Sequence, residues 1–283
     1  MVQPLLKWVG NKRKVANKII SYFPKNFNNY YEPFVGSGAI IAELIEEKLQ
    51  GAIKFNNSYA SDNNKYLIDI FNYVKDNPQM LIKYYKKHID NYMLDKAKNY
   101  DLIKERFNNN PNGLDFCLLS RTCYGGIIRF RKDGYMSTPV GPHTPINSDK
   151  FAQRVNSWHK LIQNTNFEVM DYKDTMNKAQ KGDIIYCDPP YTHSQSILYG
   201  AQDFQIEELW NSIRDAKSRG VKILLSINGK RNSNTKDISI TPPTDLFERI
   251  IDIDVGVSMV DRLQNKHKHM INSKVTDYLM LTY

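Results

Sequence analysis

Short apolar runs alternate with amphipathic segments over most of the chain. The runs that predict strands, because they are short and rich in β-branched and aromatic residues, cover positions 30–34, 58–61, 166–170, 184–187, 221–227, 247–255 and 275–283. Apolar residues at helical spacing predict helices over positions 39–47, 65–74, 148–162 and 206–219. Strands that alternate with helices predict an α/β fold, in which a mostly parallel sheet carries helices on both faces.

Two local signals set boundaries within this pattern. Ser148 is expected to cap the helix that it begins, because a serine hydroxyl can accept a hydrogen bond from a free N–H group of the first turn. The turn residues Asn228-Gly229-Lys230 are expected to end the strand that precedes them.

The pattern changes between about positions 76 and 163, where polar helical segments rich in tyrosine and lysine replace the alternation. This stretch is too long to be a simple connection. We therefore expect a mainly helical subdomain at 76–163, inserted into a sheet domain made of residues 1–75 and 164–283. Within the insertion, Asp133-Gly134 flanked by Phe130 and Tyr135 predicts a β-hairpin.

Composition adds charge to this picture. The 283 residues include 39 lysines and arginines against 30 aspartates and glutamates, which gives a formal charge of +9 and a pI near 9.2. Such a surface suits a polyanionic partner, although a basic surface that only keeps the protein soluble fits about as well.

The cysteines and the hydropathy bear on metals, membranes and location. The three cysteines form no metal-binding pattern with the six histidines and indicate a reducing cytosol, so no metal is expected. No stretch approaches the ~18 to 20 apolar residues of a membrane span, and the N-terminus lacks a signal-type apolar core. We therefore expect a soluble, cytoplasmic protein without a membrane partner.

The most informative chemistry is the tetrapeptide Asp188-Pro189-Pro190-Tyr191, which directly follows the apolar run 184–187. Two consecutive prolines cannot extend a strand ladder, so the strand must end there. A carboxylate, two carbonyl groups and an aromatic ring are then presented at the carboxyl end of a strand, where α/β sheets bind ligands. A Pro-Pro pair alone is more often a plain turn, so the rest of the chain decides between a turn and a site.

A glycine turn follows the first predicted strand. Gly36 and Gly38 let the backbone approach a ligand closely, and the helix after them begins with unpaired N–H groups. Asp62 ends the next strand, 24 residues after Gly38. A carboxylate about 20 residues past such a glycine turn suits the two hydroxyl groups of a ribose. The alternative is that Asp62 only caps the helix that begins near Asn64.

Two other segments carry candidate chemistry. Residues 5–14 place Trp8 among basic residues around a glycine, and either Trp8 packs into the core or the segment closes over a ligand. Asp171-Tyr172 puts another acid and ring at a predicted strand end.

The predicted hairpin region interleaves cations with aromatic rings. Its candidate contacts are Arg121, Tyr124, Arg129, Arg131 and Lys132. Cations can bind phosphates or guanine edges, and rings can stack on bases. A charged edge that only prevents aggregation would look similar, but the net charge favours nucleic acid.

Taken together, these segments resemble the alpha group of DNA adenine N6-methyltransferases, the Dam type, over most of the chain and in the group's motif order. The similar segments are the N-terminal motif 6–12, the glycine loop 32–39, Asp62, Asp171-Tyr172, the tetrapeptide 188–191 and the hairpin 124–141 with its Pro-x-Gly. Each match alone is weak, and together they are specific.

The resemblance implies a Rossmann-like sheet domain that binds S-adenosylmethionine and an insertion that recognises double-stranded DNA. The cofactor-binding positions that it implies are Trp8, Lys12, Pro33, Phe34, Gly36, Gly38, Asp62, Asp171, Tyr172 and Asp188. The catalytic positions are Asp188, Pro189, Pro190 and Tyr191. The hairpin would insert Tyr124 into the duplex and bring Arg129 to a phosphate or a base edge.

The implied reaction is methylation of N6 of an adenine that is flipped out of duplex DNA. The enzyme would act as a monomer, either with a cognate restriction endonuclease or as an orphan methylase. Cytosine N4 and RNA adenine offer the same kind of amino group, and a non-catalytic DNA-binding module is an alternative of another class. Gly125 stands where the Dam type has asparagine, so the Dam recognition sequence is not carried over. Asn11 replaces a common glycine.

Overall fold

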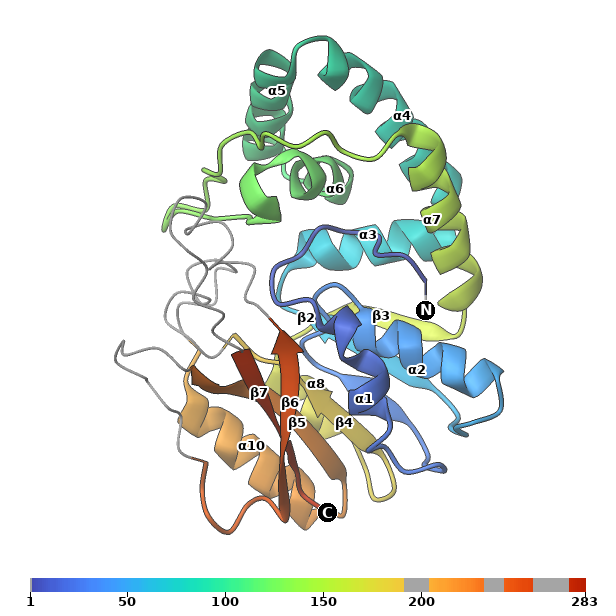
Figure 1. Cartoon of the computed structure of the whole chain (residues 1–283), viewed down its shortest axis with the longest axis vertical. Helices are drawn as coiled ribbons and strands as arrows, with labels where there is room; N and C mark the ends of the chain where they lie inside the picture. Colours follow the sequence, from blue (N-terminus) through green and yellow to red (C-terminus); the bar gives the residue numbers. More distant parts are fainter. Residues whose placement is uncertain (1, 191–203, 232–241, 257–274) are drawn as a thin grey trace.

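The fold is built on one twisted sheet. The structure is a computed structural model that describes residues 2–190, 204–231, 242–256 and 275–283. Within these residues seven strands form a sheet in the order β3-β2-β1-β4-β5-β7-β6 (Figure 1). The strands are β1 Tyr30–Glu32, β2 Ser58–Asp62, β3 Thr165–Val169, β4 Ile184–Cys187, β5 Lys222–Arg231, β6 Arg249–Gly256 and β7 Val275–Leu281.

The predicted strands and helices are all present, and the sheet is mostly parallel as expected. The strands from β3 to β5 are paired in parallel, whereas β7 is antiparallel to both of its neighbours, β5 and β6. The helices are α1 Ala16–Ile20, α2 Ala39–Leu49, α3 Lys65–Asp76, α4 Pro78–Leu94, α5 Lys96–Asn109, α6 Gly113–Thr122, α7 Ser148–Leu161, α8 Tyr172–Lys178 and α10 Ile206–Ser218. Short 3-10 helices cover η1 Lys12–Lys14 and η2 Tyr124–Gly126.

Helices cover both faces of the sheet because consecutive strand residues point to opposite sides. On β4, Ile184 belongs to the apolar cluster that α1, α2, α3 and α7 complete, whereas its neighbour Ile185 belongs to a second cluster formed with α8 and α10. Both side chains are fully buried. This arrangement is the α/β fold with helices on both faces of a mostly parallel sheet that the sequence predicts.

The helices between β2 and β3 are continuous with the sheet domain. Figure 1 shows α4, α5 and α6 stacked beyond α3, on the side towards which the arrow of β6 points. Buried aromatic residues of these helices, such as Tyr85, Phe107 and Phe116, belong to the same apolar cluster as Ile184 of the sheet. The inserted helices therefore have a fixed position relative to the strands.

A buried carboxylate joins three of these helices. Asp115 of α6 is fully buried and accepts hydrogen bonds from Tyr84 of α4 at 2.8 Å and from Arg106 of α5. Asn112, which caps α6, also donates to it at 3.0 Å. These partners hold the pKa of Asp115 below its usual value despite its burial, so the charge is retained as a link between the helices.

The predicted hairpin is present as a turn with sparse pairing. Antiparallel bridges join Phe130 to Met136 and Cys123 to Val140, without a continuous ladder between them. The Asp133-Gly134 turn forms as expected, because Gly134 takes a φ of +80° and Asp133 accepts a hydrogen bond from the Tyr135 N–H group.

Two boundary predictions are wrong. The cap of α7 is Asn147, whose side chain accepts a hydrogen bond from the Lys150 N–H group at 2.9 Å, and Ser148 is the first helical residue. Strand β5 continues through Asn228 to Arg231, because β7 pairs with it across this stretch, with a register shift. An available partner strand outweighs the turn tendency of the local residues.

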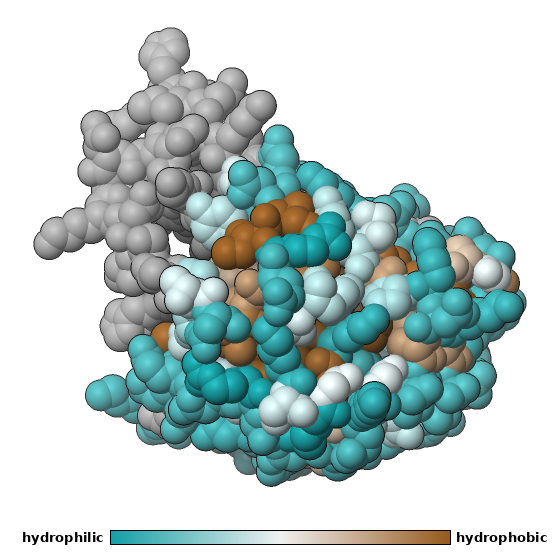
Figure 2. Space-filling view, turned by 90° about the horizontal axis from the view of Figure 1, so that it is seen from below, coloured by the Kyte–Doolittle hydropathy of each residue, from teal (hydrophilic) through white to brown (hydrophobic). Residues whose placement is uncertain are grey.

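The side of the molecule away from the inserted helices is shown in Figure 2, seen from below. Its described surface is mainly hydrophilic, with small apolar areas between the polar side chains. No helix of the described residues is both long and apolar enough to cross a membrane.

Candidate active site at the carboxyl edge of the sheet

Four neighbouring parallel strands bring acidic residues to one edge of the sheet. Glu32 is the last residue of β1, and Asp62 is the last residue of β2. Asp171 and Asp188 follow β3 and β4 within two residues. Because β3, β2, β1 and β4 are adjacent and parallel, their carboxyl ends meet at the same edge, where α/β folds bind ligands.

Asp188 is largely buried and carries an ion pair. Its side chain is 21% exposed, and its Oδ1 lies 3.1 Å from the Nζ of Lys12 in η1. Desolvation raises the pKa of Asp188 to about 6, against the opposing effect of the Lys12 cation. Pro189 and Pro190 follow without N–H groups, and Pro189 is buried, so the chain leaves the sheet at this point. Tyr191 lies outside the described residues.

Lys12 is shared between two carboxylates. Its Nζ also lies 3.1 Å from Oδ2 of Asp277, whose side chain is only 7% exposed. Asp277 is near the start of β7, and because β7 runs against β5, the start of β7 lies at the edge where the parallel strands end. The sequence analysis missed Asp277. Its signal is an acidic residue within an otherwise apolar strand.

The glycine loop adopts the backbone conformation that the sequence predicts. Gly36 and Gly38 have φ values of +48° and +71°, which other residues rarely adopt. Trp8 lies against the loop, since a side chain at position 36 would come within 3.2 Å of its indole Nε1. The structure thus brings the predicted residues of the N-terminal motif to the glycine loop.

Asp62 joins two loops at this edge. Its carboxylate accepts hydrogen bonds from the Gly36 N–H group at 3.2 Å and from the Asn64 N–H group at 3.0 Å. Desolvation raises its pKa to about 6, while these two donors act in the opposite direction. The cap of α3 is Asn64, whose side chain accepts from the N–H groups of Tyr66 and Leu67. Helix capping by Asp62 therefore does not account for its position.

Aromatic rings gather beside the acidic edge. Phe34 stacks on Tyr172 with 5.2 Å between ring centroids, and Phe204 contacts both rings. The Tyr172 hydroxyl is buried and has no hydrogen-bond partner among the described residues. Pro33, which directly precedes Phe34, is buried. Asp171 caps α8 by accepting a hydrogen bond from the Lys173 N–H group at 2.9 Å. The cluster offers a flat apolar surface and one unused polar group.

Glu32 is a buried acid that the sequence analysis quoted only as part of a motif. It is 2% exposed, and burial raises its pKa to about 8, so it is mostly protonated at neutral pH. The Tyr30 hydroxyl donates to it at 2.7 Å, and the Ile41 N–H group in the first turn of α2 also bonds to it. Glu32 therefore joins the end of β1 to the start of α2.

The hairpin exposes most of the predicted DNA contacts. Arg129, Arg131 and Lys132 are exposed, and the Tyr124 side chain is 43% exposed. Arg131 pairs with Asp133 and lies over the Tyr135 ring, 4.9 Å from its centroid. These side chains belong to the insertion, beyond the acidic edge of the sheet.

Arg121 is not part of this exposed group. Its guanidinium is part-buried at the end of α6 and donates to the backbone carbonyl of Leu5 at 2.5 Å. Arg154 and Trp158 of α7 donate in the same way to the carbonyls of Pro4 and Gln3, at 2.7 and 2.9 Å. Arg121 is thus one of three side chains that fasten the N-terminal segment to the inserted helices.

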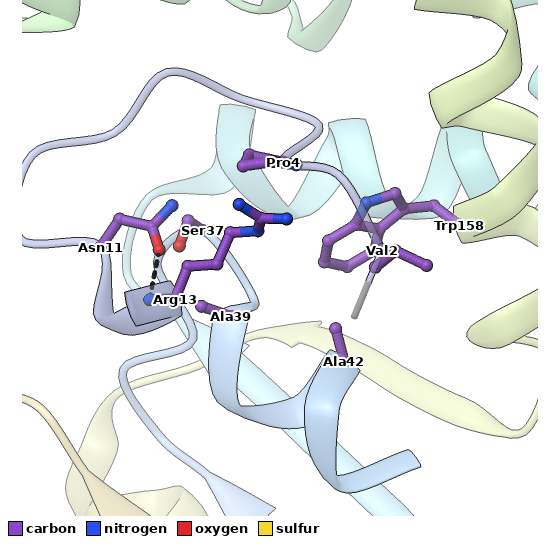
Figure 3. Close-up of a pocket in the computed structure, with 8 residues that line it drawn as sticks. All are labelled: Val2, Pro4, Asn11, Arg13, Ser37, Ala39, Ala42 and Trp158. Atoms are coloured by element: carbon purple, nitrogen blue, oxygen red, sulfur yellow. Dashed lines mark hydrogen bonds between the residues drawn. The ribbon is translucent and has the colours of Figure 1, made fainter. Parts of the chain in front are cut away.

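A small pocket lies at the start of α2, next to the glycine loop (Figure 3). It holds about 220 Å³ of empty space, part of it open to solvent, and Asn11 accepts a hydrogen bond from the Arg13 N–H group at its rim. Its lining residues are Val2, Pro4, Asn11, Arg13, Ser37, Ala39, Ala42 and Trp158. This space includes open solvent, so the enclosed part falls well short of the ~300 to 1,000 Å³ of typical ligand sites, and we assign no ligand to it.

Comparison with known proteins identifies the family of the chain. Residues 8–259 match the family described as D12 class N6 adenine-specific DNA methyltransferases, and the matched range covers every strand up to β6. The chain belongs to this family.

Similar relatives of the D12 chain come from archaea and bacteria. The type II methyltransferase M.MjaIII of Methanocaldococcus jannaschii is 29% identical over 80% of this chain and 84% of its own. M1.LlaDCHI, a type II methyltransferase of Lactococcus lactis subsp. cremoris, is 27% identical over 80% and 81% of the two chains. The DNA adenine methylase of Haemophilus influenzae is 28% identical over 79% of each.

In this D12 methyltransferase, Gly38→Ala should lower stability more than Gly51→Ala does. Both glycines have a positive φ, a strain of about 1 to 3 kcal/mol for other residues. Only at Gly38 would the new methyl group also lie 3.0 Å from Trp158 and 3.2 Å from Phe71, whereas nothing lies within 4 Å at Gly51. Urea unfolding of both variants measures the difference. Equal losses would show that the close packing at Gly38 adds no constraint.

Proposed function

We propose that this enzyme is a site-specific DNA methyltransferase that transfers a methyl group from S-adenosylmethionine to N6 of an adenine flipped out of duplex DNA. The observation that carries the proposal is the position of Asp188. A carboxylate at the end of β4, held by a buried lysine and followed by two prolines, suits the binding of an exocyclic amino group. The family name favours adenine in DNA over cytosine N4, RNA adenine or a non-catalytic module.

Asp188 and a backbone carbonyl would prepare the amino group for reaction. The lone pair of adenine N6 is delocalised into the ring, which makes it a poor nucleophile. Two acceptors, the Asp188 carboxylate and most simply the Pro189 carbonyl, would favour a pyramidal nitrogen whose lone pair faces the methyl donor. Proline suits the second position because its ring restricts the backbone that carries the carbonyl. The contribution is positioning and electrostatic stabilisation, and Asp188 need not take the proton before transfer.

The residues at the acidic edge fit the cofactor. S-adenosylmethionine supplies a methyl group on a positively charged sulfur. Asp62 would accept hydrogen bonds from the ribose hydroxyls, since its carboxylate lies against the glycine loop, bonded to the Gly36 N–H group at 3.2 Å. Phe34, Tyr172 and Asp171 would hold the adenine ring of the cofactor, and the unused Tyr172 hydroxyl supports a polar ligand there. Trp8, Lys12, Pro33, Gly36 and Gly38 would complete the site.

The insertion would read the DNA. We propose residues 76–163 as the target-recognition subdomain and residues 1–75 with 164–283 as the catalytic domain. The target base must leave the duplex to be reached, at a cost of about a few kcal/mol. Tyr124 would enter the duplex in its place, and Tyr191 would stack on the flipped base. Arg129, Arg131 and Lys132 would contact bases or phosphates, whereas we give Arg121 a structural role because of its bond to the N-terminal segment.

Partners and location follow from this function. We propose that the enzyme acts as a monomer on double-stranded DNA in the cytoplasm. Two of the similar relatives are named type II methyltransferases, which supports a cognate restriction endonuclease that acts on the same site.

Asp188→Ala should abolish methylation, because the variant loses an acceptor for the reacting amino group. Single-molecule sequencing of DNA from cells that express the protein should show N6-methyladenine at one short motif with the unmodified enzyme and none with the variant. Asp174→Ala, at an exposed position of α8, is the matched control and should methylate normally. Substantial methylation by Asp188→Ala would refute the proposed mechanism, and no modified base with either protein would refute the function.

Asp62 should make cofactor binding depend on pH. Its pKa of about 6 means that the carboxylate is charged at pH 8 and mostly protonated at pH 5, so affinity for S-adenosylmethionine should fall as the pH is lowered through 6. Asp62→Ala should bind weakly at every pH. Calorimetry from pH 5 to 8 measures both effects, with Asp188→Asn included because Asp188 titrates in the same range. Unchanged affinity in Asp62→Ala would leave Asp62 with the loop-joining role alone.

Arg129→Ala should relax sequence specificity, whereas Lys132→Ala should weaken binding to all sequences alike. The Arg129 backbone is bonded on both sides, to Thr138 at 2.9 Å and to Ser137 at 3.0 Å, which fixes the point of the hairpin from which its exposed side chain would reach a base edge. Lys132 lies in the turn and suits a phosphate. Losing a bidentate base contact costs about 1 to 3 kcal/mol at one position, and losing a phosphate contact reduces the salt dependence by about one ion. Binding to matched and single-mismatch duplexes at several salt concentrations distinguishes the two, and a uniform loss for Arg129→Ala would reassign it to phosphate.

A further inference from the structure

The start of β7 places a second carboxylate against the lysine that pairs with Asp188. Asp277 binds the same Lys12 Nζ as Asp188, at the same distance of 3.1 Å. Lys12 and Asp277 are the more deeply buried members, with side chains 9% and 7% exposed, and Asp188 is the most accessible at 21%. Lys12 and Asp277 are therefore less accessible to a ligand than Asp188 is, and Asp277 is a second carboxylate that holds the lysine.

The charge of this cluster suits methyl transfer. With both carboxylates ionised, the three groups carry one net negative charge. S-adenosylmethionine would supply the methyl group: as its bond to sulfur breaks and the bond to N6 forms, positive charge would develop on the amino group, which would then lose a proton to water. A net negative cluster stabilises that developing charge, whereas a neutral Lys12–Asp188 pair would not.

We propose, on the basis of the function above, that Asp277 is a positioning residue of the methyl-transfer site, which acts by holding Lys12 so that the Asp188 oxygen atoms stay available to the target amino group and the three-residue cluster keeps its net negative charge. Without Asp277, Asp188 is the remaining one of these two carboxylates that can pair with Lys12. The lysine then competes with the substrate for the oxygen atoms of Asp188. Asp277 itself does not touch the substrate.

Other titratable groups around Asp188 are accounted for. Lys12 comes from η1, Asp277 from β7, and Glu32 from β1, where burial raises its pKa to about 8 and leaves it mostly neutral. On β4 itself, Tyr186 and Cys187 have pKa values raised by burial and are uncharged near neutral pH. Asp277 raises the pKa of Asp188 and Lys12 lowers it, so the two act on Asp188 in opposite directions.

The first test measures kinetics. Asp277→Asn should lower the single-turnover rate roughly 10- to 100-fold on an unmethylated duplex that carries the motif the enzyme recognises, with little change in the KM for DNA. Because removal of a neighbouring negative charge lowers the pKa of Asp188, the acid limb of the rate profile should move to lower pH. Asp277→Glu should restore part of the rate. Asp252→Asn is the control, since Asp252 is exposed on β6, the strand paired with β7, and this variant should keep the unmodified rate and pH profile.

A Lys12→Met background tests whether Asp277 acts through the lysine. In this background Asp277→Asn should lower the rate no further. A rate loss of the same size with or without Lys12, or a loss with an unshifted acid limb, would overturn the proposal and leave Asp277 a structural residue.

A second readout does not need activity. Carbon NMR of aspartate-labelled protein without cofactor, with the Asp188 signal assigned from Asp188→Asn, should show the Asp188 pKa below about 6 in Asp277→Asn and above it in Lys12→Met. If the proposed function is wrong, the unmodified enzyme will show no methylation, but the two pKa shifts of Asp188 will still be observed. An unchanged Asp188 pKa in both variants would overturn the inference itself.

Discussion

Parallel pairing of β3, β2, β1 and β4 is the constraint on which the site depends. Four strands that run the same way must end along one edge, and three of their carboxyl groups, on Glu32, Asp62 and Asp188, are largely desolvated there. Burial of a carboxylate is unfavourable unless the charge is paired, bonded or removed. Each of the three carboxyl groups meets this requirement with a different set of partners.

The partners that compensate burial differ among the three acids. Glu32 is mostly protonated and bonds to Tyr30 and to the first turn of α2, so it serves as a neutral structural link. Asp62 accepts hydrogen bonds from backbone N–H groups of the glycine loop and of its own loop. Asp188 has an ion pair with Lys12 instead. A side-chain partner can be shared between groups, whereas a backbone partner is fixed, and a side-chain partner therefore suits the role that we propose for Asp188.

The sequence predicted most of this fold because its signals were local. The apolar run before Asp188, the glycines at 36 and 38 and the acid after β2 each follow from strand and turn chemistry within a few residues, and the structure brings them to one edge. The misses involve distant partners. Asn228 looked like a strand end, and only pairing with β7 extends β5 past it. Asp277 could not be connected to Lys12, because the antiparallel direction of β7 decides which of its ends reaches the site.

Arg121 illustrates the same limit and indicates how the two parts of the enzyme are joined. By sequence it belongs with the cations of the hairpin, yet it bonds to the carbonyl of Leu5, next to the donors from α7 that hold Pro4 and Gln3. The segment fastened in this way leads within a few residues to Trp8, against the glycine loop, and to Lys12, between Asp188 and Asp277. The inserted helices share a continuous apolar core with the sheet and also hold the segment that supplies Lys12. The part of the chain that we propose to read DNA therefore helps to set the position of Lys12, the cation that pairs with the carboxylate that we propose as catalytic.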